Sequence, residues 1–194
     1  PVVRQALETG VDLVSFSGDK ILGGPQSGVI VGSAAYVDRI VENPLMRALR
    51  CDKLILSALE ATLELYRQGP EQLRDSLPVL RMMTDSVETV ESRAAELVAS
   101  LAPTTREKLR PRIEVSVAQA GSGALPLEEL PTRVVALQPD WCASESLARA
   151  LRLQEPAVMG RIHRDRVLLD MRTVFDAEIL AVSRALDAAA RSAT

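Results

Sequence analysis

Two short apolar runs, at residues 11–16 and 28–31, most limit what this chain can fold into. Continuous apolar runs of this length, bounded by glycine and polar residues, are typical of buried strands. The segment between them reads SGDKILGGPQS over residues 17–27, so it places Lys20 in a glycine-rich loop. Glycine lets a backbone turn sharply and approach a ligand closely. The pattern therefore predicts two buried strands joined by a loop that carries a lysine.

The local pattern leaves two interpretations of Lys20 open. A lysine held between buried strands can lose solvation and act as a Schiff-base nucleophile. An ordinary surface lysine in a strand–loop–strand unit fits the same pattern. Strand, turn and lysine by themselves do not decide between these interpretations.

Composition excludes several classes of function. The 194 residues allow one large or two small domains, and a hydrophobic content of 47% supports an α/β core. A net charge of −3 argues against a basic nucleic-acid clamp. His163 is the single histidine, and Cys51 and Cys142 are far apart, so neither a metal site nor a disulfide framework is expected. Without a membrane-spanning run or a signal-peptide pattern, we expect a cytoplasmic protein with half-buried thiols.

The central part of the chain predicts helices. Residues 34–42 read as a short helix that ends at Asn-Pro. Asp52 can cap a helix to about Arg67, whose apolar face would hold Leu56, Leu59, Leu63 and Tyr66. From residue 78 to 101, apolar residues recur every three or four positions. This spacing predicts one long amphipathic helix, packed against its own domain or extended as a coiled-coil arm.

Beyond residue 103, predicted strands and helices alternate. Strands are predicted at residues 112–118, 132–137, 158–162 and 166–171, and helices at residues 143–153 and 177–190. The last two strands would form a hairpin, and Asp176 would cap the last helix. This order predicts a small α+β domain with helices over one face of an antiparallel sheet.

Longer motifs add a family resemblance. The string SFSGDKILGGPQSG at residues 15–28 resembles the pyridoxal-phosphate lysine segment of the bacterial L-seryl-tRNA(Sec) selenium transferase family. NPLMRALRCDKL at residues 43–54 is similar to the family's NPL-x-RALR-x-DK segment. Shorter matches continue along the chain at residues 58–66, 121–126, 158–162 and 168–172. The resemblance is collinear and covers nearly the whole chain.

The resemblance implies a fold and a domain organisation. The expected fold class is α/β, the C-terminal portion of an aspartate-aminotransferase-type (fold type I) transferase dependent on pyridoxal 5'-phosphate. Residues 1–69 would be the end of the large cofactor-binding domain, 70–77 a connection, and 78–194 the small α+β domain. Because the chain starts at Pro1 rather than Met, we expect a fragment that is inactive by itself. The phosphate-binding loop, the acidic partner of the pyridine nitrogen and the tRNA-binding region would precede it.

The implied activity is conversion of L-seryl-tRNA(Sec) to L-selenocysteinyl-tRNA(Sec) with selenophosphate. Lys20 would bind pyridoxal phosphate as a Schiff base and then act as the base on the serine Cα proton. Loss of the serine hydroxyl would leave a tRNA-bound aminoacrylyl group, to which selenium adds. Asp19 would orient the lysine amine or cap the turn, and Ser17 and Gln26 would hydrogen-bond the cofactor.

Arg47 and Arg50 are the next candidates. They are spaced i, i+3, so on a helical turn both guanidinium groups project from the same side. Two such groups make a site for a phosphate-like anion, although a solvated basic face is the ordinary alternative in an arginine-rich chain. The match to RALR favours the anion site, for selenophosphate or for terminal tRNA phosphates. Arg161 is a weaker candidate for gripping substrate.

Two other functions stay open. A paralogous pyridoxal-phosphate lyase or aldolase, acting on a free amino acid or sugar acid, would share the lysine, but the retention of both arginines favours the transferase. A non-catalytic assembly domain would have no physical need for the lysine loop. The resemblance also implies a homo-oligomer, a ring of dimers with active sites at subunit boundaries, and no membrane partner.

Overall fold

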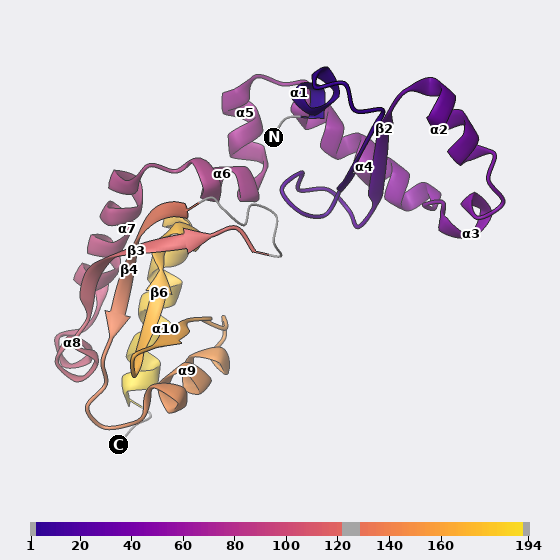
Figure 1. Cartoon of the computed structure of the whole chain (residues 1–194). Helices are drawn as coiled ribbons and strands as arrows, with labels where there is room; N and C mark the ends of the chain where they lie inside the picture. The colour runs from indigo at the N-terminus through magenta and orange to yellow at the C-terminus, as the bar shows by residue number, and fades with distance from the viewer. Residues whose placement is uncertain (1–2, 122–128, 192–194) are drawn as a thin grey trace. The chain divides into compact units, whose positions relative to one another are not determined.

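The chain forms two compact units, residues 1–81 and residues 82–194 (Figure 1). This computed structural model describes residues 3–121 and 129–191. Residues 122–126 of the expected motif at 121–126 therefore lie outside the described part. Residues 70–77, expected to be a connection, largely form helix α5 (Pro70–Ser76).

The first unit is built on a two-stranded antiparallel sheet. Strand β1 (Leu13–Ser17) pairs with β2 (Gly28–Gly32), with Ser17 opposite Gly28. The other elements of this unit are helices α1 (Val3–Glu8), α2 (Ala34–Val41), α3 (Met46–Leu49), α4 (Lys53–Tyr66) and α5. The predicted strand–loop–strand pattern is confirmed.

Local signals set the helix boundaries of this unit. Helix α2 ends at Val41, one residue before the predicted end, and Glu42 separates it from Asn43 and Pro44. At the start of α4, the Asp52 carboxylate accepts a hydrogen bond of 2.9 Å from the backbone N–H of Ile55. A side-chain acceptor at this position satisfies one of the amide groups that a helix start leaves free. The prediction of an Asp52-capped helix is therefore confirmed.

The prediction that these strands are buried is wrong. Every residue of β1 and β2 is half-buried or exposed, and Gly18 and Leu77 are the buried residues of the first unit within the described part. A sheet of two strands shields few side chains, and α4 covers it incompletely. Leu59 and Tyr66 on the predicted apolar face of α4 are half-buried, whereas Leu56 and Leu63 are exposed.

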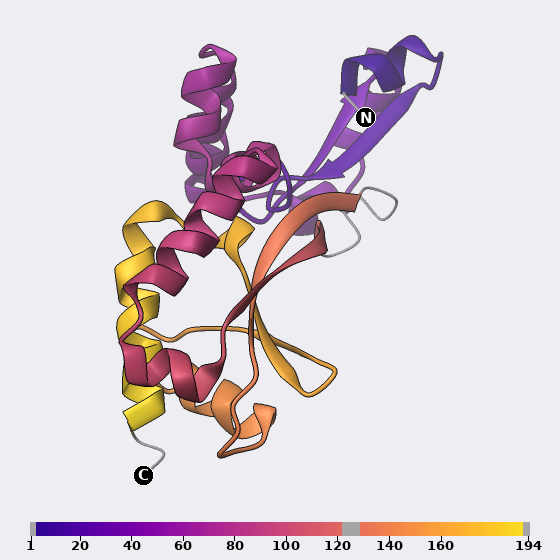
Figure 2. The same cartoon turned by 90° about the vertical axis from the view of Figure 1, so that its left-hand side faces the viewer.

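The second unit is a four-stranded antiparallel sheet with helices on one face, as Figures 1 and 2 show. The strand order is β3-β4-β6-β5. The strands are β3 (Arg112–Gln119), β4 (Glu129–Leu137), β5 (Arg161–His163) and β6 (Arg166–Asp170). The helices are α7 (Val87–Ser100), α8 (Pro103–Leu109), α9 (Ser144–Arg152) and α10 (Ile179–Arg191), with 3-10 turns at η1 (Met171–Thr173) and η2 (Asp176–Glu178). The predicted α+β domain is confirmed.

The core of the second unit lies between the sheet and these helices. Alternate residues of the central strands point into it, because side chains alternate between the two faces of a strand. The most buried members are Val90, Ala94, Leu97, Leu109, Val135, Leu137, Leu151, Val167, Met171, Ile179 and Leu186. The apolar stripe of α7 thus packs within its own unit rather than forming a coiled-coil arm.

One predicted helix is in fact two. Helix α6 (Pro78–Thr84) ends at Thr84, and α7 begins after Ser86, whose hydroxyl accepts a hydrogen bond of 3.2 Å from the backbone N–H of Thr89. Asp85, between the helices, is buried and accepts a 2.7 Å hydrogen bond from Arg93. The apolar spacing runs through this break without interruption, so periodicity alone could not reveal it.

Asp176 does not cap the last helix as predicted. Its carboxylate accepts a 2.6 Å hydrogen bond from Nε of the buried Arg93. Asp176 opens the short turn η2, and α10 starts only at Ile179. A long-range ion pair has therefore taken the side chain that the local pattern assigned to a cap.

The predicted hairpin is confirmed, although its first strand, β5, begins only at Arg161, so residues 158–160 of the predicted strand are not part of it. Strands β5 and β6 pair with His163 opposite Arg166. The two residues between them, Arg164 and Asp165, have φ angles of 49° and 56°. Two successive left-handed residues make the tight turn that matches the twist of antiparallel strands.

Arginine side chains cover part of the sheet face opposite the helices. Val134, Ala136 and Leu168 form a small buried cluster separate from the main core. Arg161 on β5 reaches across two strands to donate a 2.7 Å hydrogen bond to Ser116 on β3. Arg166 on β6 crosses one strand to pair with Glu114 at 2.5 Å. The apolar stems of long cationic side chains can shield hydrophobic surface in this way.

Candidate functional site

The loop that carries Lys20 is closed by backbone hydrogen bonds. Gly18 N–H donates to the Ser27 carbonyl at 2.8 Å and extends the β1–β2 pairing by one step. Gly24 N–H donates to the Gly18 carbonyl at 2.8 Å, and Gly23 N–H donates to the Lys20 carbonyl at 2.9 Å. The last of these bonds closes a four-residue turn that starts at Lys20. The lysine therefore lies on an ordered turn.

Two glycines of this loop are required by its geometry. Gly18 is buried, and a Cβ atom there would meet the Ser27 hydroxyl and lie 2.9 Å from the Pro25 carbonyl oxygen. Gly23 has a φ angle of +74°, which strains a residue with a side chain. The glycine content of the sequence thus serves to bring loop backbone segments together.

The loop brings four predicted site residues together. Asp19, Lys20 and Gln26 are exposed, and Ser17 at the end of β1 is half-buried. A primary amine, a carboxylate, a hydroxyl and a side-chain amide therefore lie on one short loop. The exposed lysine can be reached by a ligand from solvent.

Helix α4 and the segment after it brace this loop from outside. The Tyr66 hydroxyl donates a 3.0 Å hydrogen bond to the Leu22 carbonyl, 44 positions earlier in the sequence. A Cβ atom on Gly24 would lie 3.4 Å from the Thr62 hydroxyl. One on Gly23 would lie 3.3 Å from Leu77. Burial raises the pKa of the Tyr66 phenol above its ordinary value, so the hydroxyl keeps its proton near neutral pH.

Sequence reasoning missed the contact made by Tyr66. The pattern placed this residue on the apolar face of a helix and gave it no polar partner. A tyrosine among leucines on the apolar face of a helix is itself a signal, because a hydroxyl shielded from water usually finds an acceptor. The sequence offered no means of identifying that acceptor as the lysine turn.

Arg47 and Arg50 line the same hollow. It has a volume of about 450 Å³, is open to solvent, and is lined by Val41, Asn43, Pro44, Met46, Arg47 and Arg50. Arg47 belongs to α3, whereas Arg50 follows this short helix with an extended backbone. The two arginines therefore do not share a helical turn as the spacing predicts, yet they border one cavity. Both are exposed.

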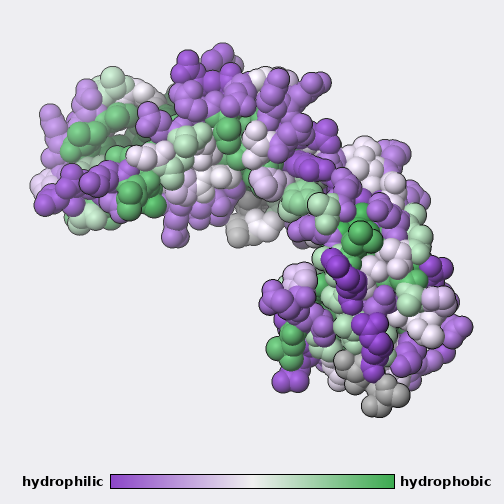
Figure 3. Space-filling model, turned by 180° about the vertical axis from the view of Figure 1, so that it is seen from behind, coloured by the Kyte–Doolittle hydropathy of each residue, from purple (hydrophilic) through white to green (hydrophobic). Residues whose placement is uncertain are grey.

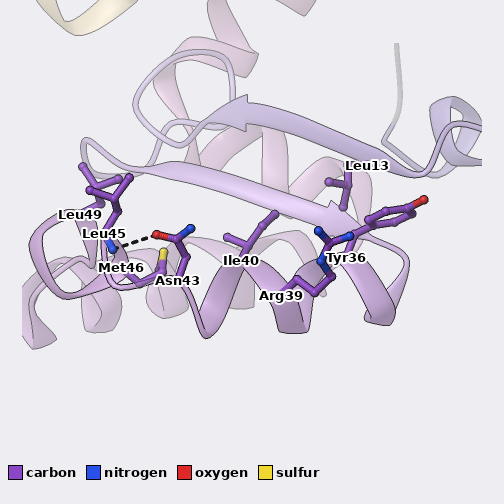
Figure 4. A pocket seen from close by; sticks show the side chains of 8 residues that line it. All are labelled: Leu13, Tyr36, Arg39, Ile40, Asn43, Leu45, Met46 and Leu49. Atoms are coloured by element: carbon purple, nitrogen blue, oxygen red, sulfur yellow. Dashed lines mark hydrogen bonds between the residues drawn. The ribbon is translucent and has the colours of Figure 1, made fainter.

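A second hollow of about 420 Å³ shares Asn43 and Met46 with the first (Figure 4). Leu13, Ile40, Leu45 and Leu49 make most of its lining apolar, and Tyr36 and Arg39 stand together at one end. The Asn43 side chain accepts a 3.0 Å hydrogen bond from the Leu45 backbone N–H and so stabilises the turn between α2 and α3. None of the predicted site residues lines this hollow.

The lysine loop and the arginine hollow lie toward opposite ends of α4. The loop contacts the C-terminal half of this helix through Thr62 and Tyr66. Arg50 comes two residues before Asp52, which caps its start. A helix of 14 residues is about 20 Å long. Within one copy, the chain brings the residues of each set together but keeps the two sets apart.

The histidine and the two cysteines lie outside both sets of predicted site residues. His163 is exposed at the end of β5, and Arg161 donates to Ser116. Cys51 and Cys142 are half-buried free thiols, and burial raises the pKa of Cys142. Across residues 3–121 and 129–191, no cluster of three or more His, Cys, Asp or Glu could hold a metal ion. None of the helices in those ranges is long and apolar enough to cross a membrane.

Comparison with known proteins identifies close relatives. Residues 1–175 match the family model described as L-seryl-tRNA selenium transferase. The L-seryl-tRNA(Sec) selenium transferase of Geobacter sulfurreducens is 45% identical over 186 residues, which cover 96% of this chain and 40% of that protein. The corresponding protein of Aquifex aeolicus is 43% identical and is covered to 40% of its length. The chain thus spans about two fifths of the curated relatives that it matches.

A solved structure supports the fold class. The structure of D-glucosaminate-6-phosphate ammonia-lyase matches 96% of this chain and 45% of its own chain, with a TM-score of 0.59 and 20% sequence identity. At this identity the likeness shows the fold alone. The mixed α/β fold expected from the resemblance, that of fold type I enzymes, is confirmed.

Proposed function

Because the chain belongs to the L-seryl-tRNA(Sec) selenium transferase family, we propose that it is the part of such an enzyme that carries the cofactor lysine. The observation that carries this proposal is that Lys20 is an exposed residue on a turn closed by backbone hydrogen bonds. Residues 1–69 would then end the cofactor-binding domain, and residues 78–194 would form the small domain. The whole protein would convert seryl-tRNA(Sec) to selenocysteinyl-tRNA(Sec) in the cytoplasm.

The loop fits the cofactor that this chemistry requires. Pyridoxal phosphate, when bound, supplies an electron sink for the negative charge that develops at the substrate Cα. Its aldehyde needs an accessible primary amine, which Lys20 offers from an ordered turn. Ser17 and Gln26, on the same loop, would donate hydrogen bonds to its polar substituents. The hydrogen bond between Gly18 and Ser27 brings the two ends of the loop together. Ser17 and Gln26 could therefore bind one ligand.

Lys20 would also move a proton. Once substrate has displaced it from the cofactor, the Lys20 amine would take the proton from the serine Cα, a role that suits a positioned amine. Asp19 is adjacent and exposed, so its carboxylate would orient the protonated amine. Loss of the serine hydroxyl then leaves the acceptor for selenium on the tRNA.

Arg47 and Arg50 would hold the selenium donor. Selenophosphate is a small anion, and two guanidinium groups at one cavity provide donors for its oxygens. In the substrate the serine carboxylate is esterified to tRNA, so these arginines are not needed to bind a free carboxylate. They would also bind terminal tRNA phosphates.

The separation of the two residue sets supports a homo-oligomer. The lysine loop and the arginine hollow lie toward opposite ends of the α4 helix, which is about 20 Å long. A second copy of the chain, placed against the lysine loop, would supply its arginine hollow to the same active site. An active site shared between two copies would explain why the lysine loop and the two arginines are both exposed in a single copy.

The experiment that tests the function uses the full-length protein charged with pyridoxal phosphate. It is given seryl-tRNA(Sec) and selenophosphate, and the amino acid hydrolysed from the tRNA is then identified. We expect selenocysteine from the wild-type protein. Lys20→Ala should lose both the product and the visible absorbance of the bound cofactor. Unchanged serine from wild-type protein that keeps this absorbance would instead favour a lyase acting on a free small molecule.

The arginine double variant separates donor binding from cofactor binding in the same assay. Arg47→Ala with Arg50→Ala should keep the cofactor absorbance and lose selenium addition. Exposed Arg39→Ala with Arg67→Ala is the matched control, with the same charge removed from the same unit. Normal product at ordinary donor concentrations in the Arg47/Arg50 variant would contradict the proposed anion site.

A further inference from the structure

We propose that Tyr66 is a positioning residue for Lys20. Its hydroxyl donates to the carbonyl of Leu22, inside the turn that starts at the lysine, and so holds that turn in one conformation. This inference rests on the proposed function, because it gives the turn a role in presenting Lys20 to the cofactor. It concerns a residue that touches neither cofactor nor substrate in the proposed site.

An internal and an external hydrogen bond hold the backbone of the turn. Internally, Gly23 N–H donates to the Lys20 carbonyl at 2.9 Å. Leu22, the third residue of the turn, directs its carbonyl to Tyr66 on α4 at 3.0 Å. With Gly23 at φ +74°, glycine freedom gives this backbone a range of accessible conformations. Because the Tyr66 hydroxyl holds the Leu22 carbonyl in place, the peptide group next to Gly23 has fewer accessible orientations.

The neighbouring contacts shape the loop without replacing this anchor. Thr62 lies beside Gly24, but its hydroxyl donates a 2.9 Å hydrogen bond to Ala58 within α4. Leu77 and Val79 flank Gly23 through carbon atoms. Packing of this kind limits volume, whereas a hydrogen bond also fixes the direction of a peptide group. Tyr66 therefore adds an orientation that the apolar contacts do not supply.

The geometry favours positioning over acid–base catalysis by Tyr66. Its hydroxyl proton is directed to a backbone carbonyl rather than to open solvent. Burial raises the pKa of this phenol, so it remains a donor over the range in which such an enzyme works. The hydrogen bond from Tyr66 to Leu22 therefore stabilises the turn and does not transfer a proton.

Tyr66→Phe tests the brace by hydrogen exchange in the full-length protein. The variant keeps the ring and removes only the donor. Because a net hydrogen bond changes an opening equilibrium by about fivefold, the Gly23 and Gly24 amides should exchange about fivefold faster. Amides in the middle of α4 should not change. Tyr36→Phe, at the chain's other tyrosine, is the control and should leave the loop amides unaffected.

A second readout reports on Lys20 itself. Pyridoxal phosphate is added, the adduct is reduced with borohydride, and mass spectrometry gives the share of label on each lysine. Lys53 and Lys108, the two other lysines, serve as references within the same molecule. In wild-type protein Lys20 should take most of the label. In Tyr66→Phe the share of label on Lys20 relative to Lys53 should fall below the wild-type value, because more molecules then hold the amine outside the folded turn.

The two readouts distinguish failure of the inference from failure of the proposed function. Unchanged exchange and unchanged labelling in Tyr66→Phe would overturn the positioning role while leaving Lys20 as the cofactor lysine. Equal labelling of all three lysines in wild-type protein would overturn the proposed function, and the role of Tyr66 with it, even if the loop amides exchanged faster. A uniform change in labelling of all lysines would indicate general destabilisation and would also overturn the inference.

Discussion

Arg172 is a single buried side chain that binds backbone carbonyls from distant parts of the second unit. It is 4% exposed, and its guanidinium donates to the carbonyls of Met82 at 2.9 Å and Asp85 at 2.8 Å, and to that of Pro131. These acceptors lie around the α6–α7 break and at β4. The sequence marked this residue only as the end of a motif at 168–172, because nothing local indicates which distant carbonyls a side chain will meet.

Arg172→Met should destabilise the second unit strongly. The substitution keeps an apolar stem but leaves three carbonyl groups without their charged donor. Since an unsatisfied buried polar group costs about 1–3 kcal/mol, we expect a loss of about 3 kcal/mol or more in the free energy of unfolding. Urea denaturation measures this loss. Arg152→Met, at an exposed position of α9, should change the same quantity by less than about 0.5 kcal/mol.

A loss below about 1 kcal/mol in Arg172→Met would contradict this account, because it is no more than one ordinary hydrogen bond contributes. It would mean that water or a rearranged backbone satisfies the three carbonyls at little cost. The exposed control separates this outcome from a general tolerance of the unit to arginine loss.

Helices and strands were predictable where their signals are local. Asp52, Asn43 and Pro44 mark helix ends through side-chain capping or a missing backbone donor, and the structure follows them. The α6–α7 break was not predictable from periodicity, because apolar spacing continues through it. Ser86 is a good capping residue, and the neighbouring Asp85 binds Arg93, which also binds Asp176 in η2. No local pattern indicates these two pairs.

Ser86→Ala should weaken the start of α7. Loss of the hydroxyl leaves the Thr89 backbone N–H without its 3.2 Å acceptor. Replacing an N-cap serine by alanine costs about 1 kcal/mol, which should appear as a lower free energy of unfolding in urea. Ser92→Ala, at an exposed position within the same helix, should cause no loss because alanine favours helix interiors. Equal effects at the two serines would rule out a capping role.

The two units differ in how completely they bury their apolar residues. In the second unit, core side chains on α7, β4, β6 and α10 are almost wholly inaccessible. In the first unit many large apolar residues are exposed, including Val41 at 63%, Leu49 at 71% and Leu54 at 73%. Figure 3 shows hydrophobic side chains among polar ones on that unit's surface. Burial is the main stabilising contribution to a fold, so the units should differ in stability.

Hydrogen exchange on the 194-residue chain tests this difference. Amides of β4, β6 and α10 should open only with global unfolding of the second unit and so exchange slowest. Amides of β1, β2 and α2 should exchange at least about tenfold faster, since local stability follows buried contact. Comparable protection in both units would show that exposed apolar area does not limit the stability of the first unit.

The candidate site was predictable to a different extent at each of its two parts. The lysine loop could be located because its residues are contiguous and its glycines mark a turn. The arginine pair was found from spacing and resemblance, although Arg50 lies outside the helix that the spacing assumed. The distance between the two parts could not be predicted, because it depends on which end of α4 each segment meets.

The placement of the aromatic residues gives the chain separate optical reporters. Trp141, the single tryptophan, is half-buried against the core of the second unit, 5.7 Å from the Lys108 ammonium group. Both tyrosines, Tyr36 and Tyr66, belong to the first unit. Tryptophan emission therefore monitors the integrity of one unit and tyrosine absorbance that of the other. A variant at Lys20 can leave tryptophan emission unchanged while its own unit has lost structure, so the folding control for the site must come from the tyrosines.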